Sequence, residues 1–157
     1  MNSDNPWFDN RTPKDFILCR EPVTELTQSL IEKMISDGKE AIRRKDVNGL
    51  MSLIALDFTY LGPELINGEV KTVSGNRDRF QIAMCGTFEA SNCDSYTMEV
   101  TSVEVTSPES ANVTLVVSNP CDSQYSNFYG SEVRETIKIE LYQGRPVISR
   151  LVIENPA

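Results

Sequence analysis

The sequence predicts an α+β fold in which helices come first along the chain and strands follow. From Val23 to Ile42 the apolar residues recur at a spacing of three and four, which is typical of an amphipathic helix. Beyond Cys93 the apolar residues alternate with polar ones, and β-branched residues become frequent, which is typical of half-buried strands. Helices followed by a run of strands indicate an α+β domain with an antiparallel meander.

The first helix is expected to begin near Val23 and to end in a basic turn. Its apolar stripe comprises Val23, Leu26, Leu30, Met34, Ile35, Ala41 and Ile42. Gly38 lies inside this helix, where a glycine costs about 1 kcal/mol relative to alanine. We therefore expect a packing reason for Gly38, such as the close approach of another element or room for a ligand.

A second, short helix is expected after Asp46, because aspartate accepts the free amide hydrogens of a first helical turn. Residues 58–61 then predict a first strand, which Gly62-Pro63 is expected to stop. Asn67-Gly68 predicts a tight turn between two extended segments.

The third helix is expected to begin at Ser74, a good N-cap residue, and to end at Gly86. Four strands are expected after it, at residues 96–106, 111–119, 132–142 and 147–154. The polar loop 120–130 between two of these strands is longer than a hairpin requires, and its three aromatic residues suit either a pocket lid or packing at the domain edge.

The composition predicts one domain. The chain has 157 residues, of which 39% are hydrophobic, enough for one sizeable core. We expect residues 23–157 to form this domain and residues 1–22, which carry Trp7 and Phe8, to lie on it as an N-terminal arm.

Charge and composition exclude several kinds of partner. A formal net charge of -8 argues against nucleic acid and against an anionic membrane surface. No apolar run reaches the 18 residues of a membrane span, and no N-terminal leader pattern is present in the sequence as written. The chain has no histidine and no CxxC motif, so neither a metal nor another cofactor is expected.

Cysteine usage leaves the compartment open. The four cysteines Cys19, Cys85, Cys93 and Cys121, with glycosylation-type triplets at Asn10 and Asn112, suit a secreted protein whose leader is absent from this sequence. Four small buried hydrophobes in a cytoplasmic protein are the alternative. Under the first alternative we hypothesise a Cys85–Cys93 disulfide, with Cys19 and Cys121 as a second pair.

Two segments carry a family resemblance. Ala41-Ile42-Arg43-Arg44-Lys45-Asp46-Val47-Asn48-Gly49-Leu50, followed by Leu56-Asp57-Phe58-Thr59-Tyr60, resembles the NTF2-like (SnoaL-like, ketosteroid-isomerase-like) superfamily over residues 23–154. The resemblance implies three N-terminal helices packed on a strongly curved antiparallel sheet that together enclose a conical, mostly apolar pocket. The positions expected to line that pocket are Gly38, Tyr60, Gly62, Phe80 and Tyr96.

The catalytic residues of ketosteroid isomerases are missing at the positions that the resemblance aligns. The general-base aspartate of those enzymes falls on Gly62, the oxyanion-hole tyrosine falls on Gly38, and the protonated aspartate falls near Lys138. Glycine can neither move a proton nor donate to an oxyanion. Cyclase-like and dehydratase-like members generally use histidine, which this chain lacks.

Acidic and phenolic residues remain as weak catalytic candidates, with Asp57, Tyr60 and Glu64 first among them. Each also has an ordinary structural interpretation, because tyrosines are common in strands and glutamates between apolar residues usually mark a solvent face. The full set that could face a pocket is Asp57, Tyr60, Glu64, Tyr96, Glu99 and Glu135.

These observations favour an NTF2-like domain without catalytic activity that binds a small apolar ligand or a protein partner and forms a homodimer through the open face of its sheet. The alternative is an acid–base enzyme, an isomerase, dehydratase or hydrolase of a hydrophobic small molecule. A third interpretation is an assembly module whose pocket is filled by its own side chains. A buried carboxylate beside a tyrosine in the pocket would discriminate between them.

Overall fold

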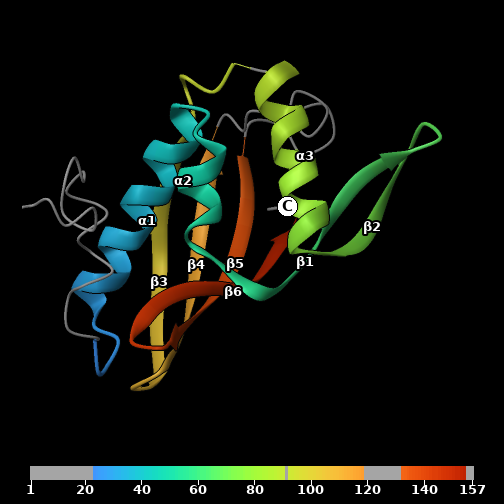
Figure 1. Cartoon of the computed structure of the whole chain (residues 1–157). Coiled ribbons are helices and arrows are strands. Elements are labelled where there is room, and N and C mark those ends of the chain that lie inside the picture. Colours follow the sequence, from blue (N-terminus) through green and yellow to red (C-terminus); the bar gives the residue numbers. More distant parts are fainter. Residues whose placement is uncertain (1–22, 91, 119–131, 155–157) are drawn as a thin grey trace, which may run out of the picture.

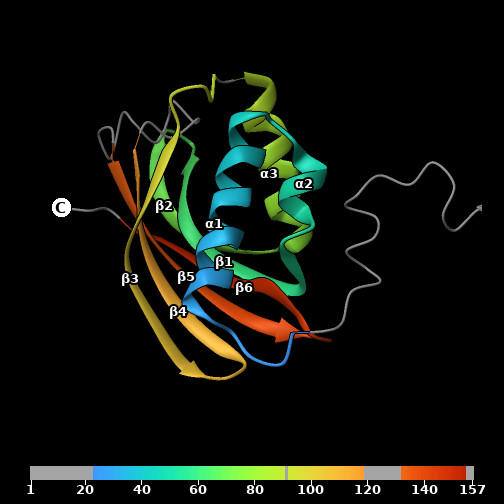
Figure 2. The ribbon, with the colours of Figure 1, turned by 90° about the vertical axis from the view of Figure 1, so that its left-hand side faces the viewer.

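Three helices lie on the concave face of one curved six-stranded sheet in the part of the chain that the computed structural model describes, residues 23–90, 92–118 and 132–154 (Figure 1, Figure 2). The helices are α1 (Gln28–Arg43), α2 (Val47–Met51) and α3 (Arg77–Ala90). The strands are β1 (Ile54–Ile66), β2 (Glu69–Asn76), β3 (Thr97–Ser107), β4 (Ser110–Ser118), β5 (Glu132–Tyr142) and β6 (Arg145–Glu154). The predicted α+β class is confirmed, and the four strands after Cys93 lie within two residues of their predicted ends over the described residues.

The sheet is mixed, not purely antiparallel as expected. Its strand order is β2-β1-β6-β5-β4-β3, and β1 pairs with β6 in parallel, with Ile54 beside Ile148 and Leu61 beside Val152. The four other strand pairs are antiparallel. The parallel pair is possible because α3 and the β3–β5 meander separate β1 from β6 along the chain, which gives the crossover the length that parallel pairing requires.

Helix α1 begins later than predicted, because the chain before it is extended. Thr27 caps the helix, and its hydroxyl accepts a hydrogen bond from the Leu30 amide at 3.2 Å. Upstream, the Val23 and Leu26 amides donate to the carbonyls of Gly144 and Pro108, at 2.9 and 2.7 Å. These bonds hold the segment before α1 against the turns at one end of the sheet.

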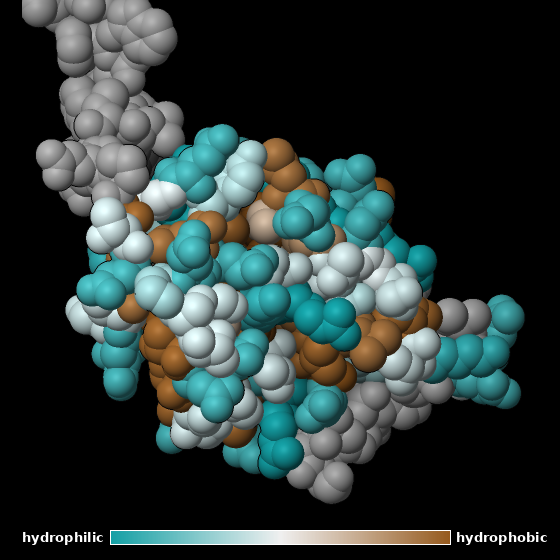
Figure 3. All heavy atoms as spheres, turned by 90° about the horizontal axis from the view of Figure 1, so that it is seen from below, coloured by the Kyte–Doolittle hydropathy of each residue, from teal (hydrophilic) through white to brown (hydrophobic). Residues whose placement is uncertain are grey.

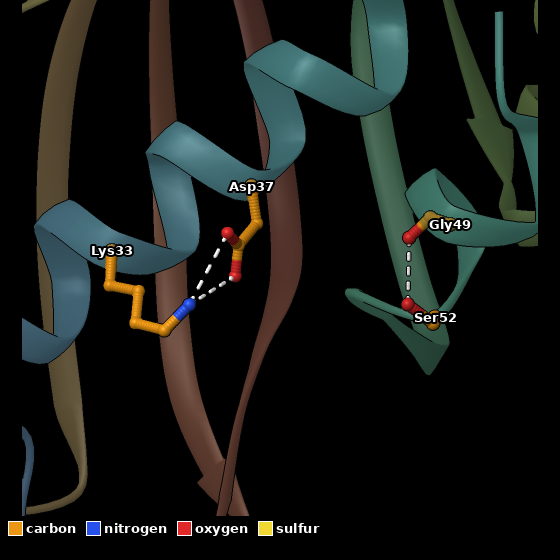
Figure 4. Close-up of polar contacts among 4 residues, drawn as sticks. All are labelled: Lys33, Asp37, Gly49 and Ser52. Atoms are coloured by element: carbon orange, nitrogen blue, oxygen red, sulfur yellow. Dashed lines mark hydrogen bonds and ion pairs between the residues drawn. The ribbon is translucent and has the colours of Figure 1, made fainter. Parts of the chain in front are cut away.

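Four residues of the predicted stripe, Met34, Ile35, Ala41 and Ile42, are buried in α1. Ile31, which the predicted stripe omitted, is buried as well, whereas the predicted Leu30 is only half-buried. On the exposed face Lys33 Nζ lies 3.2 Å from Asp37 Oδ2, one turn further along the helix (Figure 4).

Helix α2 begins at the predicted cap. The Gly49 amide donates to Asp46 Oδ1 at 2.9 Å, and an added Cβ at Gly49 would collide with the Asp46 carboxylate. The Ser52 hydroxyl donates to the Gly49 carbonyl at 2.7 Å and closes the helix (Figure 4). The short α2 therefore depends on Asp46 at its start and on the absence of a side chain at Gly49.

Strand β1 runs through Gly62-Pro63, where the sequence predicted a stop. Its pairing with β6 ends at Leu61, so at Pro63 it is paired only with Thr72 of β2. A proline lacks an amide donor and is tolerated where one side of a strand has no partner. The Asn67-Gly68 turn is as predicted, with positive φ angles of 52° and 83°.

Helix α3 differs from its prediction at both ends. Ser74 lies in β2, and the amide of Arg79 donates to the side chain of Asn76 at 3.0 Å, so Asn76 caps the helix. The helix then continues through Gly86 to Ala90. An added Cβ at Gly86 would meet nothing within 4 Å, so this glycine faces open space and costs only its intrinsic helix propensity.

The core lies between α1 and the concave face of β1, β4, β5 and β6. Its most deeply buried members include Phe58, Ile31, Leu115, Ile139 and Val113. Val117 belongs to a second cluster, where it packs with Leu50 of α2 and Phe88 of α3. On β4, buried residues alternate with half-buried ones along the whole strand, as expected for a strand with one face toward the core.

The predicted Cys85–Cys93 disulfide is wrong. Cys85 carries a free thiol on α3, whereas Cys93 is disulfide-bonded. Cys19 and Cys121 lie outside the described residues, as do the N-terminal arm 1–22 and the loop 120–130. No helix among the described residues is long and apolar enough to cross a membrane.

Candidate functional site

A cavity of about 160 Å³ lies between the helices and the concave face of the sheet. Its walls come from every described helix and from β1, β3, β4, β5 and β6. Most wall residues are aliphatic, among them Ile35, Ile42, Leu50, Leu115, Val117 and Leu151. A cavity with such walls excludes most polar ligands and favours apolar ones.

Three aromatic rings line the cavity from β1 and α3. The ring centroids of Phe58 and Phe80 lie 5.1 Å apart, those of Tyr60 and Phe80 6.0 Å, and those of Phe58 and Tyr60 6.4 Å. Tyr60 is opposite Gly75 on β2, and an added Cβ at Gly75 would collide with the Tyr60 ring. The aromatic wall therefore depends on a glycine in the neighbouring strand.

Glu135 of β5 brings a carboxyl group to the cavity wall. It shares a strand face with Val133 and Ile137, which are both buried and both line the cavity. Burial raises the pKa of Glu135 from 4.5 to about 7, because an apolar environment disfavours the ionised form. Near neutral pH both protonation states of this carboxyl group are therefore populated.

Tyr96 lies close to Glu135 in the same cavity. The tyrosine is only 5% exposed, and its carbonyl accepts a hydrogen bond from Arg43 Nε at 2.8 Å, which links the start of β3 to the end of α1. Burial and then the charge of Glu135 raise the pKa of Tyr96 well above 10, so its phenol stays neutral near pH 7. The pair combines a titrating carboxyl group with a neutral hydroxyl that can donate or accept a hydrogen bond.

Four of the five positions expected to line a pocket do line this cavity: Gly38, Tyr60, Phe80 and Tyr96. Gly62 is not among its described wall residues. An added Cβ there would lie 3.3 Å from Cβ and Cδ1 of Ile153, so the Ile153 side chain occupies the space beside Gly62 and itself lines the cavity.

The acidic candidates are not brought together. Asp57 is exposed on the opposite side of β1 from Phe58, Glu99 is exposed on β3, and the side chain of Glu64 lies outside those that the structure describes. Lys138, near the aligned position of a catalytic aspartate, is on the opposite face of β5 from Ile137 and lies 3.5 Å from Glu140. The acidic residue that this strand presents to the cavity is Glu135, three residues earlier.

The sequence contained a signal for Glu135. In the stretch Val133-Arg134-Glu135-Thr136-Ile137-Lys138-Ile139, the glutamate occupies an apolar place in the two-residue alternation. A charged residue on the core face of a strand needs a reason, because such residues are seldom buried without a partner or a function.

A second hollow of about 800 Å³ lies at the end of the sheet where the β3–β4 and β5–β6 turns are found. It is more polar, and its wall includes Asp57, Arg77, Glu109, Glu140, Arg145 and Tyr142. Figure 3 views the molecule from this end, where hydrophilic residues dominate the surface and hydrophobic ones show between them. No group of three or more residues with metal-binding side chains occurs in the described part of the chain.

No protein-family model matches the sequence, and no curated protein matches it either. Solved structures do match over nearly their whole length. An NTF2-like protein of unknown function from Shewanella oneidensis is similar over 82% of this chain and 99% of its own, with 14% identity and a TM-score of 0.62. A ketosteroid isomerase-like protein from Erwinia carotovora atroseptica matches with 16% identity and a TM-score of 0.62, over 82% of this chain and 95% of its own.

A third structure, an NTF2-like protein of unknown function from Silicibacter pomeroyi, shares 17% identity over 82% of this chain and 98% of its own, with a TM-score of 0.60. At sequence identities this low, the structural similarity shows a shared fold and gives no evidence for a shared activity. The resemblance stated from the sequence agrees with these matches. The chain therefore has the NTF2-like fold.

Proposed function

We propose that the domain binds a small apolar ligand in the cavity between its helices and its sheet. The observation that carries this proposal is the cavity itself, about 160 Å³ of space whose walls are aliphatic and aromatic. Proteins normally fill such space with their own side chains, since interiors are packed as densely as organic crystals. An unfilled apolar cavity with convergent polar groups is the usual form of a small-molecule site.

The volume limits the size of the ligand. A cavity of roughly 150 Å³ with apolar walls accommodates benzene, so the cavity here suits a molecule of about that size. A steroid is several times larger and would require the walls to move apart. We therefore expect small aromatic or alicyclic molecules to bind before steroids do.

Gly38 offers the direct test. It is buried in α1 and lines the cavity, so Gly38→Leu places four extra carbon atoms at the wall. We expect toluene, titrated into the protein and followed by amide chemical shifts, to bind the wild type and to lose at least tenfold in affinity in Gly38→Leu. The matched control is Gly86→Leu, because Gly86 is also helical but faces open space away from the cavity.

Gly86→Leu should bind toluene with the affinity of the wild type. The midpoint of denaturant unfolding, measured for each variant, should show that both variants are folded. An absence of toluene binding to the wild type, or equal binding to both leucine variants and the wild type, would contradict the proposal. An absence of binding would mean that the side chains of the cavity close it in solution, as the assembly-module interpretation requires, and equal binding would mean that toluene binds elsewhere on the protein.

A second candidate function is acid–base catalysis, and Glu135 is the specific observation that favours it. A general acid or base works best when its pKa lies near the working pH, and the pKa of Glu135 is about 7. In an isomerisation, the Glu135 carboxylate would take a proton from the carbon next to a carbonyl group and return it at another carbon, while the Tyr96 hydroxyl hydrogen-bonds the oxygen. The substrate class is a small cyclic enone that fits the cavity.

Conversion of 3-cyclohexen-1-one to 2-cyclohexen-1-one, followed by ultraviolet absorbance, would test this candidate. Loss of a positioned base costs about 10² to 10⁴ in rate, so Glu135→Gln should bring any activity close to background. A rate that is unchanged in Glu135→Gln, or no rate above buffer in the wild type, would remove this candidate and leave the binding function.

We also propose that the domain forms a homodimer through the convex face of its sheet. Leu61, Val152 and Val116 lie on that face, and each is half-buried among polar neighbours. Light scattering at about 100 μM should give twice the chain mass for the wild type and the single chain mass for Val116→Glu. A wild-type monomer at this concentration would contradict the dimer.

A further inference from the structure

We infer that the cavity recognises an apolar amine in its ammonium form, with Glu135 as the counter-charge and the aromatic wall holding the apolar body of the ligand. This inference rests on the proposed binding function and specifies the chemical class of the ligand. It depends on three features of the cavity: the sign of its charge, the position of its aromatic rings, and the neutrality of Tyr96.

The first feature is the sign of the charge. Among the described wall residues the ionisable groups are Glu135 on β5, Tyr96 before β3 and Tyr60 on β1. The α1, α2, α3, β4 and β6 residues that face the cavity are apolar side chains, a glycine and a threonine. The nearby Arg43 is not a wall residue. Its Nε donates a hydrogen bond to the Tyr96 carbonyl, and its Nη1 lies 3.5 Å from Glu40 Oε1.

An anionic ligand would therefore meet a carboxylate and no described cationic wall residue. Two like charges in an apolar site repel strongly, because little solvent screens them. A cationic ligand would instead pair with Glu135 and relieve the cost of an isolated buried carboxylate. The net charge of -8 acts in the same direction at long range, since it attracts cations toward the protein.

The second feature is the division of the cavity into an aromatic end and an acidic end. Phe58 and Tyr60 come from β1, and β6 alone separates β1 from β5, which carries Glu135. Two strand spacings amount to roughly 10 Å. A ligand with an aromatic ring at one end and an ammonium group one carbon away can pack against the rings and point its charge toward the carboxylate.

The third feature is Tyr96, which lines the acidic end beside Glu135. Its neutral phenol oxygen can accept a hydrogen bond from an ammonium group, and the face of its ring attracts cations. An ammonium group donates three hydrogen bonds and accepts none. The carboxylate of Glu135 and the phenol oxygen of Tyr96 can both accept hydrogen bonds from the ammonium group.

The inference predicts a pH dependence with a definite sign. The pKa of Glu135 is about 7, so the free cavity holds a protonated, uncharged carboxyl group below that pH. An ammonium ligand must displace this proton, and its affinity should fall about tenfold for each pH unit below 7. Between pH 7 and pH 9 the affinity should be level, since Glu135 is then ionised and the amine stays protonated.

Three ligands of nearly equal size test the inference: benzylamine, benzyl alcohol and benzoate, titrated at pH 8 and pH 5.5 by amide chemical shifts. For the wild type at pH 8 we expect benzylamine to bind at least tenfold more tightly than benzyl alcohol, and benzoate at least tenfold more weakly. At pH 5.5 the preference for the amine should nearly disappear. In Glu135→Gln, benzyl alcohol should still bind and the preference for the amine should be lost at both pH values.

The matched control is Glu140→Gln, which removes a carboxylate from the same strand but outside the cavity wall, where Glu140 lies 3.5 Å from Lys138. It should keep the preference for benzylamine. If benzyl alcohol binds and benzylamine binds no more tightly, or if the preference survives in Glu135→Gln, the amine inference is wrong and the apolar binding function stands. If none of the three ligands binds the wild type, both fail.

Discussion

The two hollows of the molecule contain acidic residues in opposite surroundings. In the cavity, Glu135 stands among aliphatic and aromatic side chains with Tyr96 beside it. In the larger hollow at the end of the sheet, Asp57 is exposed and shares the wall with Arg77, Arg145 and other polar residues. The first carboxyl group is half-buried among apolar side chains, whereas the second is exposed to water.

This difference shows why a list of acidic residues does not identify a site. The free energy of an ionised carboxylate depends on its solvation, and only a desolvated group responds strongly to a ligand of opposite charge. Asp57 is exposed to water, so a ligand that replaces this water gains little binding free energy. Glu135 lies among apolar side chains, so an opposite charge placed beside it would stabilise its ionised form more than a charge beside Asp57 would.

The largest expected difference between the two regions concerns packing. Phe58 is 1% exposed, stacks with Tyr60 and packs at a tilt against Phe80, so Phe58→Ala should lower the free energy of unfolding by about 3 to 5 kcal/mol. Tyr142, which is 56% exposed at the larger hollow, should cost less than about 0.5 kcal/mol when changed to alanine. Urea unfolding measures both, and equal losses would mean that the cavity wall is not part of the core.

The next effect is the pH dependence of stability that Glu135 confers. Below about pH 4.5 the carboxyl group is protonated in both the folded and the unfolded chain, and it contributes no dependence. Between 4.5 and about 7 the unfolded chain loses this proton and the folded chain keeps it, so stability falls as the pH rises. Above pH 7 the free energy of unfolding should be about 3 kcal/mol lower than it is below pH 4.5.

Glu135→Gln should remove this loss, because glutamine does not ionise. Denaturant unfolding at pH 4 and pH 8 measures this effect. Between these pH values the free energy of unfolding should change less in the variant than in the wild type, by up to about 3 kcal/mol. Asp57→Asn serves as the control from the larger hollow and should leave the pH profile close to that of the wild type. A wild-type profile without the predicted fall between pH 5 and pH 7 would mean that Glu135 is better solvated than its surroundings suggest.

The smallest effect concerns the polar hollow. Arg77 Nη2 donates to the Met51 carbonyl at 3.1 Å and so connects the start of α3 to the end of α2. Arg77→Leu leaves that carbonyl without this donor and should cost about 1 to 2 kcal/mol. Arg145→Leu, at an exposed position of the same hollow, should change stability by less than about 0.5 kcal/mol, and denaturant unfolding would detect a reversal of this order.

Local chemistry in the sequence predicted much of the fold. Asp46 caps α2 as expected, and the alternation of β4 and β5 placed those strands almost to the residue, because each signal involves neighbours along the chain. The error at Pro63 arose because a distant segment decides. Pro63 is tolerated in β1 because the pairing of β1 with β6 ends at Leu61, so no partner on that side requires an amide donor. The residues near Pro63 in the sequence do not show where β6 ends.

The site was harder to predict, for the same reason. The family resemblance implied that Tyr60, Phe80 and Tyr96 line the pocket, and they line the cavity. Glu135 was among the residues that could face a pocket, and its place in the alternation of β5, in line with Val133 and Ile137, put it on the core face, but this pattern does not show what surrounds it there. Its environment is made by residues from α1, α3, β4 and β6, which the sequence does not show to be neighbours.

The parallel pairing of β1 with β6 also constrains the order of folding. Ile54 and Ile148 lie side by side although almost a hundred residues separate them in the chain. During synthesis the hairpin of β1 and β2 leaves the ribosome long before β6, so it cannot join the rest of the sheet until β6 has emerged. Closing so long a segment is slow, and the free edge of β1 is exposed to other chains in the meantime.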